Sequence, residues 1–262
     1  MLAFEFMRHA FAATGIVAVL AGLVGYFMVL RGESFAGHAL SHVGFAGATG
    51  AILLGMPPLW GLMALTVAAG LAMGAGGRGT TQGRDVAVGL VLSCTLGFGL
   101  LFLHFLTTSA ARATALLFGN VLGVDGAMLA WLALLAAGCV LAMAVLSRPL
   151  LFASLQPETA EARGVPVRLV STLFLAIVAV ATAECVQITG VLLVFALMVG
   201  PAATAQRLTA APGRGIVLSV LLAAAEGWGG LALSWWTDCP ASFWISALST
   251  AAYVGTYLGK RG

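Results

Sequence analysis

Long apolar stretches separated by short polar breaks dominate the chain, and this pattern predicts transmembrane helices. A helix needs about 20 apolar residues to cross the hydrocarbon core, and charged residues and prolines cut the sequence into pieces near that length. The predicted spans are Phe11 to Leu30, Ser34 to Leu54, Leu59 to Gly76, Val86 to Leu106, Gly126 to Leu146, Val167 to Ala183, Val186 to Gln206, Gly215 to Trp236 and Ser242 to Tyr257. The pattern therefore indicates an all-α polytopic bundle with nine spans.

The distribution of basic residues predicts the orientation of these spans, since loops rich in Lys and Arg stay on the cytoplasmic side. The basic residues predicted to lie on that side are Arg31, Arg78, Arg84, Arg148, Arg163, Arg168, Arg207, Arg214, Lys260 and Arg261. The other connections, at Gly55 to Pro58, Thr107 to Asp125, Glu184 to Thr189 and Thr237 to Ala241, then face outward. Nine spans place the amino terminus outside. A re-entrant segment before Asp125, where LLFGNVLG is too short to cross, would leave eight spans, and this alternative stays open.

Composition supports the membrane assignment. Hydrophobic residues make up 61% of the 262 residues and charged residues only 8%, which leaves too little polar surface for a water-soluble globule. The formal net charge of +3 comes from loop arginines and gives no reason to expect a nucleic-acid partner. The first apolar stretch lacks a small-residue cleavage site, so we expect a retained span in contact with lipid.

Two histidines are the strongest candidate for a functional site. His38 and His42 are four residues apart in an apolar stretch that has no Asp, Glu, Lys or Arg, so both lie on one face of a helix. Ionisable groups inside a membrane mark transport pathways or sites by default. A structural role, with each ring bonded to a neighbouring carbonyl, is the alternative. Small residues on the adjacent face would let a second helix approach; they are Gly37, Ser41, Gly44 and Ala48.

Three acidic residues are weaker candidates for metal ligands. Glu226 is predicted deep in a span, where a carboxyl group must be protonated or paired. Glu184 is predicted at the connection between two spans, where water could solvate it. Asp238 lies beside Cys239 at an outward turn, where it could attract cations or cap a helix. The four cysteines show no CxxC spacing, and we assign them no chemistry.

The polar loop Ser147 to Arg168 is the longest connection predicted within the chain. Gln156, Pro157 and Glu158 are typical of a helix start, and Gly164 with Pro166 of a helix end. A short cytoplasmic helix is therefore expected inside the loop, although an ordinary connection is the alternative. The sequence contains no Walker A nucleotide-binding motif, so any ATP hydrolysis must come from another subunit.

Several stretches in sequence order resemble the permease subunits of bacterial ATP-binding-cassette importers for zinc and manganese. They are VGYFMVLRGESFAGHALSHVGFAGA (Val24 to Ala48), LLFGNVLGVD (Leu116 to Asp125), LQPETAEARGVPV (Leu155 to Val167), GVLLVFALMVGPAATAQRL (Gly190 to Leu208) and the Asp238-Cys239-Pro240 turn. The resemblance covers nearly the whole chain. It implies one transmembrane domain over residues 1–262, and an architecture similar to the type II permeases of cobalamin and iron-siderophore importers.

The same resemblance implies which partner proteins the chain has and which function each subunit performs. The permease itself would not be an enzyme and would hold no permanent cofactor. It would lie in the bacterial inner membrane as a homodimer around an ion path, with an ATPase subunit and an extracytoplasmic metal-binding protein. The short helix in the loop 147–168 would dock on the ATPase through Glu158, Thr159, Ala160, Ala162 and Gly164.

The chain departs from the resembled family at one position of the histidine segment. The family usually has Gly-Asp-Ala-Leu-Ser-His, whereas this chain has His38 in place of the aspartate. Imidazole suits zinc, and oxygen ligands suit manganese, so the expected cargo is zinc first and manganese second. An intramembrane metalloenzyme or a stand-alone cation transporter could use the same pair. The enzyme would lack the glutamate of an HExxH motif, because Ala39, Leu40 and Ser41 separate the histidines.

Overall fold

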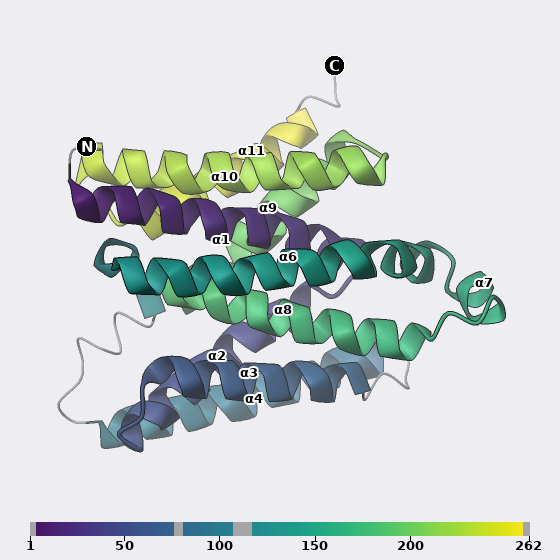
Figure 1. Ribbon diagram of the computed structural model, residues 1–262, viewed down its shortest axis with the longest axis horizontal. Coiled ribbons are helices and arrows are strands. Elements are labelled where there is room, and N and C mark those ends of the chain that lie inside the picture. Colours follow the sequence, from purple (N-terminus) through teal and green to yellow (C-terminus); the bar gives the residue numbers. More distant parts are fainter. Residues whose placement is uncertain (1–3, 76–80, 107–116, 259–262) are drawn as a thin grey trace.

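The computed structural model describes residues 4–75, 81–106 and 117–258, and these form helices without any strand (Figure 1). The helices are α1 (Glu5–Leu30), α2 (Ser34–Leu53), α3 (Pro58–Ala75), α4 (Thr81–Phe105), α6 (Gly126–Leu155), α7 (Pro157–Ala162), α8 (Val167–Thr189), α9 (Val191–Leu208), α10 (Pro212–Thr237) and α11 (Ala241–Leu258), with a 3-10 turn η1 at Val121–Gly123. The expected all-α bundle is thus confirmed for the described residues.

Each predicted span corresponds to one long helix, but the number of membrane crossings is a separate question. Six helical stretches in the described part of the chain are long and apolar enough to cross a membrane by themselves: Glu5–Leu30, Pro58–Ala75, Asp85–Phe105, Gly126–Leu155, Val167–Thr189 and Pro212–Thr237. The shorter apolar stretch Leu193–Leu208 belongs to α9. The number of membrane crossings, nine or eight, therefore stays a prediction. The predicted segment 107–116 lies outside the described residues, as do Arg78, Lys260 and Arg261.

Two predicted helix boundaries were wrong. Helix α6 continues through Pro149 to Leu155, so the first nine residues of the predicted loop Ser147 to Arg168 are helical. Helix α8 does not end at Glu184 but continues to Thr189, which removes the predicted outward connection Glu184 to Thr189. In both cases polar residues inside the hydropathy pattern predict a boundary, but the helix continues through them.

The true break between α8 and α9 is at Gly190. Its backbone has φ +80° and ψ 160°, a conformation that residues with a side chain rarely adopt. A Cβ at Gly190 would also collide with the backbone of Leu117, Phe118 and Gly119. The chain segment before η1 therefore crosses directly over this break, and the two glycines permit the contact.

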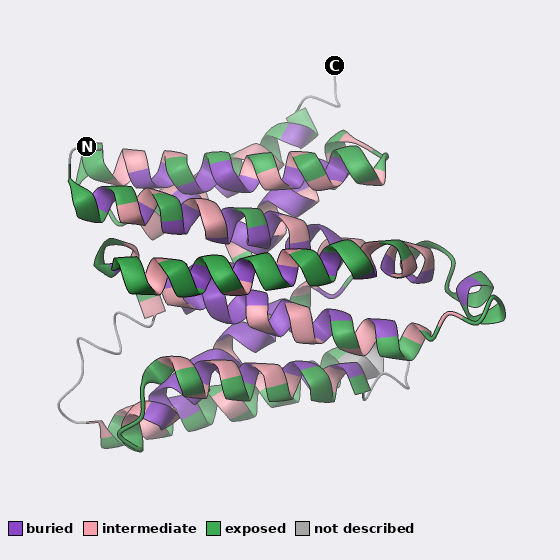
Figure 2. Ribbon diagram, in the orientation of Figure 1, coloured by how far each residue is buried: buried purple, intermediate pink, exposed green. Residues whose placement is uncertain are grey.

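The long helices run side by side (Figure 1), and α1 and α8 are more buried than α4 and α6 (Figure 2). Helix α1 packs against α6, α8, α9 and α10, whereas α4 packs chiefly against α2. Much of the α4 surface is consequently exposed and apolar, including Leu90, Phe98 and Leu100. Such a surface suits lipid or another membrane subunit.

Several arginines and helix ends meet at the end of the bundle that carries α7. Arg168 donates to the Ala75 carbonyl at the end of α3, over 2.7 Å. Gln206, near the end of α9, donates to the Tyr26 carbonyl in the last turns of α1. Arg207 donates to Thr256 near the end of α11. These arginines therefore lie at the same end of the bundle as α7, and the side of the membrane that this end faces stays a prediction.

Close glycine contacts hold α2 against α3. A Cβ at Gly61 would collide with the carbonyl of Gly47 and lie 2.6 Å from the Cβ of Ala51. The two backbones therefore touch directly, and van der Waals packing of this kind is what associates helices in a membrane.

Replacing Gly61 with alanine should destabilise the protein, because the added methyl group must push α2 and α3 apart. Overpacking of a well-packed contact costs about 1–3 kcal/mol. Thermal unfolding in detergent provides the measurement. Gly138→Ala in α6 is the matched control, since nothing lies within 4 Å of a Cβ there. Equal melting temperatures for the two variants would contradict the contact.

Candidate metal-translocation site

The histidine pair lies on the half-buried face of α2. Arg31, Gly32 and Glu33 form the turn before the helix, and His42 then falls close to the middle of α2 with His38 one turn nearer the basic side. The two imidazole centroids are 4.8 Å apart, and their planes cross at 85°. The predicted placement on one face is therefore confirmed.

The surroundings of His38 leave one ring nitrogen without a protein partner. Its Nδ1 is buried and has no hydrogen bond, while the ring lies edge-on to Phe195 of α9 at 5.3 Å between centroids. Ser41 donates its hydroxyl to the backbone carbonyl of His38 and leaves the ring untouched. A buried polar atom without a partner is costly unless something else satisfies it.

Phe195 was not singled out from the sequence. It is 40% exposed, although it lies within an otherwise buried stretch of α9 beside His38. The signal was present in the apolar segment GVLLVFALMVGPAATAQRL, but an aromatic residue there looks like any other core residue. Only the contact between α2 and α9 assigns it to the site.

The small face beside the histidines is buried within the chain. A Cβ at Gly44 would lie 3.0 Å from the Thr66 hydroxyl oxygen of α3, and one at Gly37 would collide with Met28 of α1. Ser41 and Ala48 are fully buried. Helices α1 and α3 of the same chain thus make close approaches to the small residues, α1 at Gly37 and α3 at Gly44. A position of this face beside a dimer axis or an ion path stays a prediction.

The acidic candidates lie apart from the histidine pair. Glu184 is fully buried in α8, contrary to the expected solvated position, and neither of its carboxyl oxygens has a hydrogen bond. Glu226 in α10 is also buried, beside the Ser249 hydroxyl group of α11. Asp238 ends α10 in a left-handed conformation and is exposed. Within the described ranges, no three His, Cys, Asp or Glu side chains come close enough to hold a metal ion together.

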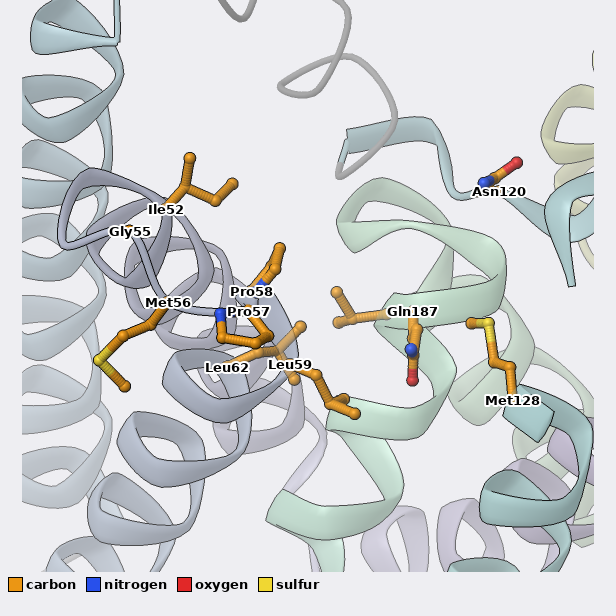
Figure 3. A pocket seen from close by; sticks show the side chains of 11 residues that line it. Ile52, Gly55, Met56, Pro57, Pro58, Leu59, Leu62, Asn120, Met128 and Gln187 are labelled. Atoms are coloured by element: carbon orange, nitrogen blue, oxygen red, sulfur yellow. The ribbon is translucent and has the colours of Figure 1, made fainter. Parts of the chain in front are cut away.

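Two cavities open at the end of the bundle opposite α7. One of about 610 Å³ lies between the α2–α3 turn and the end of α8, where Gln187 extends between Leu59 and Met128 (Figure 3). The other, of about 760 Å³, includes Asn120, Asp238 and Cys239. Neither cavity is lined by His38 or His42. These two cavities are therefore separate from the histidine pair.

The predicted short helix within the loop is present as α7. Pro157 occupies its first turn, and Gly164 ends it with φ +80°. The Val165 N–H donates to the Ala160 carbonyl, which closes the turn after the helix. Ala160 is fully buried, whereas Glu158, Thr159, Ala162 and Gly164 are exposed. Helix α7 projects beyond the ends of the long helices and is accessible to a partner (Figure 1).

Helices of membrane length, together with a short helix that projects at one end of the bundle, define a multi-pass membrane protein. The chain belongs to the ABC 3 transport family, whose sequence model matches residues 3–260. Members of this family are membrane subunits of transport systems, and not enzymes. The protein is accordingly a multi-pass protein of the bacterial inner membrane.

Similar proteins span most of the chain. A manganese transport system membrane protein, MntC, of Halalkalibacterium halodurans is 30% identical over 80% of this chain and 72% of its own length. A probable iron transport system membrane protein of Haemophilus influenzae is 28% identical over 97% of this chain and 93% of its own. The solved structure of PsaBC from Streptococcus pneumoniae in complex with Fab aligns with a TM-score of 0.86 at 25% identity, covering 97% and 91% of the two chains.

Proposed function

We propose that the protein is the permease of an importer for divalent metal ions, and that His38 and His42 bind the ion in transit. The observation that carries this proposal is the half-exposed imidazole pair with the unpartnered Nδ1 of His38. Two ligands with residual water would hold the ion briefly, as a pathway requires, since binding must be weak enough to allow release.

The relatives support a metal cargo without fixing which metal. Similar proteins carry the names of manganese and iron transport systems. The ligands of this chain favour zinc over manganese, because borderline nitrogen donors suit zinc and hard oxygen donors suit manganese. We therefore propose zinc as the preferred ion and manganese as the second.

A second copy of the chain would complete the site. One chain offers two imidazoles on one helix face, and no third candidate ligand lies beside them among the described residues. A two-fold axis facing α2 would bring four ring nitrogens together, which matches the tetrahedral coordination of zinc. The metalloenzyme alternative gains no support, because the described residues place no general base beside the pair and the family consists of transport subunits.

The experiment that tests this function is ATP-dependent uptake into sealed vesicles containing the permease, its ATPase and its metal-binding protein. Zinc and manganese are supplied separately, and accumulation inside the vesicles is measured. We expect uptake of zinc above that of manganese, and none without ATP. Uptake that persists without the ATPase would instead show a stand-alone transporter.

Helix α7 is proposed as the element that docks on the ATPase. Replacing Gly164 with valine should uncouple ATP hydrolysis from uptake, because a β-branched residue cannot adopt φ +80° without strain. No atom lies within 4 Å of a Cβ at this position, so the effect acts through the turn and not through a collision. Asparagine tolerates the left-handed region, and Gly164→Asn is the matched control that should retain coupling. Normal uptake per ATP in Gly164→Val would refute the docking role.

A further inference from the structure

The turn between α1 and α2 has a fixed geometry. The Glu33 N–H donates to the Met28 carbonyl and the Gly32 N–H to the Val29 carbonyl, which is the Schellman arrangement that ends a helix with a left-handed residue. Gly32 supplies that residue with φ +67°. The turn therefore holds the Arg31 and Glu33 side chains in a defined place at the start of the histidine helix.

The guanidinium group of Arg31 joins four helix ends. It donates to Ser171 of α8 over 2.7 Å and to Ser154 of α6 over 3.3 Å. It also pairs with Glu33, at 3.2 Å between Nη2 and Oε1. Phe174 of α8 lies beneath it, 5.6 Å from the guanidinium carbon to the ring centroid. The side chains of Arg31 and Glu33 are only 10% and 4% exposed, so these interactions are shielded from solvent.

Both serines belong to the hairpin that presents α7. Ser154 precedes the last residue of α6, and Ser171 follows the first turn of α8. Helix α7 is attached to this hairpin by the buried side chain of Ala160 and by Arg163, which lies over the Phe152 ring at 6.0 Å. A displacement of α7 would therefore move the two hydroxyl groups that Arg31 holds.

The other end of the connection is the histidine pair. Glu33 immediately precedes α2, and His38 follows five residues later, a rise of about 7 Å along a helix. Since α2 is continuous from Ser34 to Leu53, a movement imposed at Glu33 is transmitted to the imidazoles as a shift of a rigid element. The contacts thus form an unbroken sequence from α7 to the site.

We infer that Arg31 is a positioning residue that couples movement of the α7 hairpin to the histidine helix through Ser154, Ser171 and Glu33. The inference rests on the proposed import function. Arginine suits this task because its planar fork can donate to several partners in fixed directions, whereas lysine presents one flexible point charge. The shielded ion pair with Glu33 makes the connection stiff, because breaking a buried pair leaves an uncompensated charge.

The test uses the complete importer in vesicles and measures metal ions imported per ATP hydrolysed. Arg31→Lys keeps the positive charge but removes the planar guanidinium group and its several N–H donors. The double variant Ser154→Ala with Ser171→Ala removes only the two hydroxyl groups. Both should lower the ratio by about three- to thirty-fold, the range for residues that modulate coupling between sites. Copurification of the ATPase and zinc binding by the resting importer should not change.

Matched controls separate coupling from general damage. Ser147→Ala removes another hydroxyl group of α6, which donates only to the Ala144 carbonyl of its own helix. Arg148→Lys exchanges an exposed arginine of the same helix. Both variants should import as many ions per ATP as the parent protein. If Arg31→Lys fails to fold, the serine double variant decides, because it leaves the Arg31 and Glu33 pair in place.

Two results would overturn the inference. One is an unchanged ratio in the serine double variant. The other is a proportional loss of uptake and hydrolysis together with a lower melting temperature, which would indicate a structural role only. Failure of the proposed function has a different signature, namely that the parent importer accumulates no zinc or manganese, or that His42→Ala transports normally.

Discussion

Replacing His42 with alanine should abolish metal uptake while the protein still assembles with its ATPase. The imidazole lies near the middle of α2 and contacts the ring of His38 on the same face. Loss of a group that merely supports a metal ligand already costs about 10- to 100-fold in affinity or activity. Loss of the ligand itself should reduce uptake by at least that factor.

The measurement is initial zinc uptake into vesicles, normalised to the amount of assembled importer. His104→Ala is the matched control, because His104 is exposed at the end of α4 and its ring contacts Phe105. The control should transport at the parent rate. Full uptake by His42→Ala would show that the pair has a structural role, and the proposed ion path would then have to lie elsewhere.

Exchanging His38 for aspartate should shift the preference of the importer from zinc towards manganese. The substitution replaces a neutral nitrogen donor with an anionic oxygen donor, and hard oxygen ligands suit manganese. It also adds negative charge, so a divalent ion is held more by Coulomb attraction and less by the directionality that favours tetrahedral zinc. Relative uptake of the two metals should change by roughly tenfold or more, as for other groups around a bound metal.

The same substitution should alter the dependence of uptake on pH. A ligating histidine must be neutral, so uptake is retained above the protonation range of imidazole and is lost as the pH falls through it, near pH 6.5 for the free side chain. Two histidines can each take up a proton, whereas a carboxylate stays ionised to about pH 4. As the pH falls, metal uptake by the His38→Asp variant should therefore decrease less steeply than uptake by the parent protein.

Competition between zinc and manganese in the same vesicles, measured from pH 5 to 8, tests both expectations together. His38→Gln serves as the control, since it removes the imidazole without adding a charge. If the selectivity of His38→Asp and its decrease in uptake at low pH match those of the parent protein, the side chain at this position does not bind the cargo. A loss of all transport by both variants, with normal assembly, would support a ligand role but reject the predicted exchange of metals.

Much of the helical architecture follows from local patterns. Apolar length predicted where the long helices lie, and turn residues such as Gly164 predicted where α7 ends. Gly55 ends α2 in the same way, with φ +72° before Pro57 and Pro58. These features depend on residues close together in the chain, because a helix satisfies its backbone hydrogen bonds within itself.

Glu184 shows where local patterns failed. A carboxyl group between two apolar runs looks like a solvated connection, yet it lies fully buried within α8. Gly190, the residue at which α8 ends, has no unusual neighbours in sequence. Its role depends on the backbone of Phe118 and Gly119, which crosses over it from about 70 residues away.

The sequence by itself determined the class of fold, the basic side of the bundle and the shared face of His38 and His42, because hydropathy, charge and helical periodicity are local properties. Only the tertiary structure decided that Phe195 lies against His38, that α1 and α3 cover small residues of α2, and that Arg31 binds Ser154 and Ser171. Each of these contacts joins helices distant in sequence. In an almost uniformly apolar chain the helix faces look alike, so their pairing is set by the close fit of small residues and by the partners that buried polar groups must find.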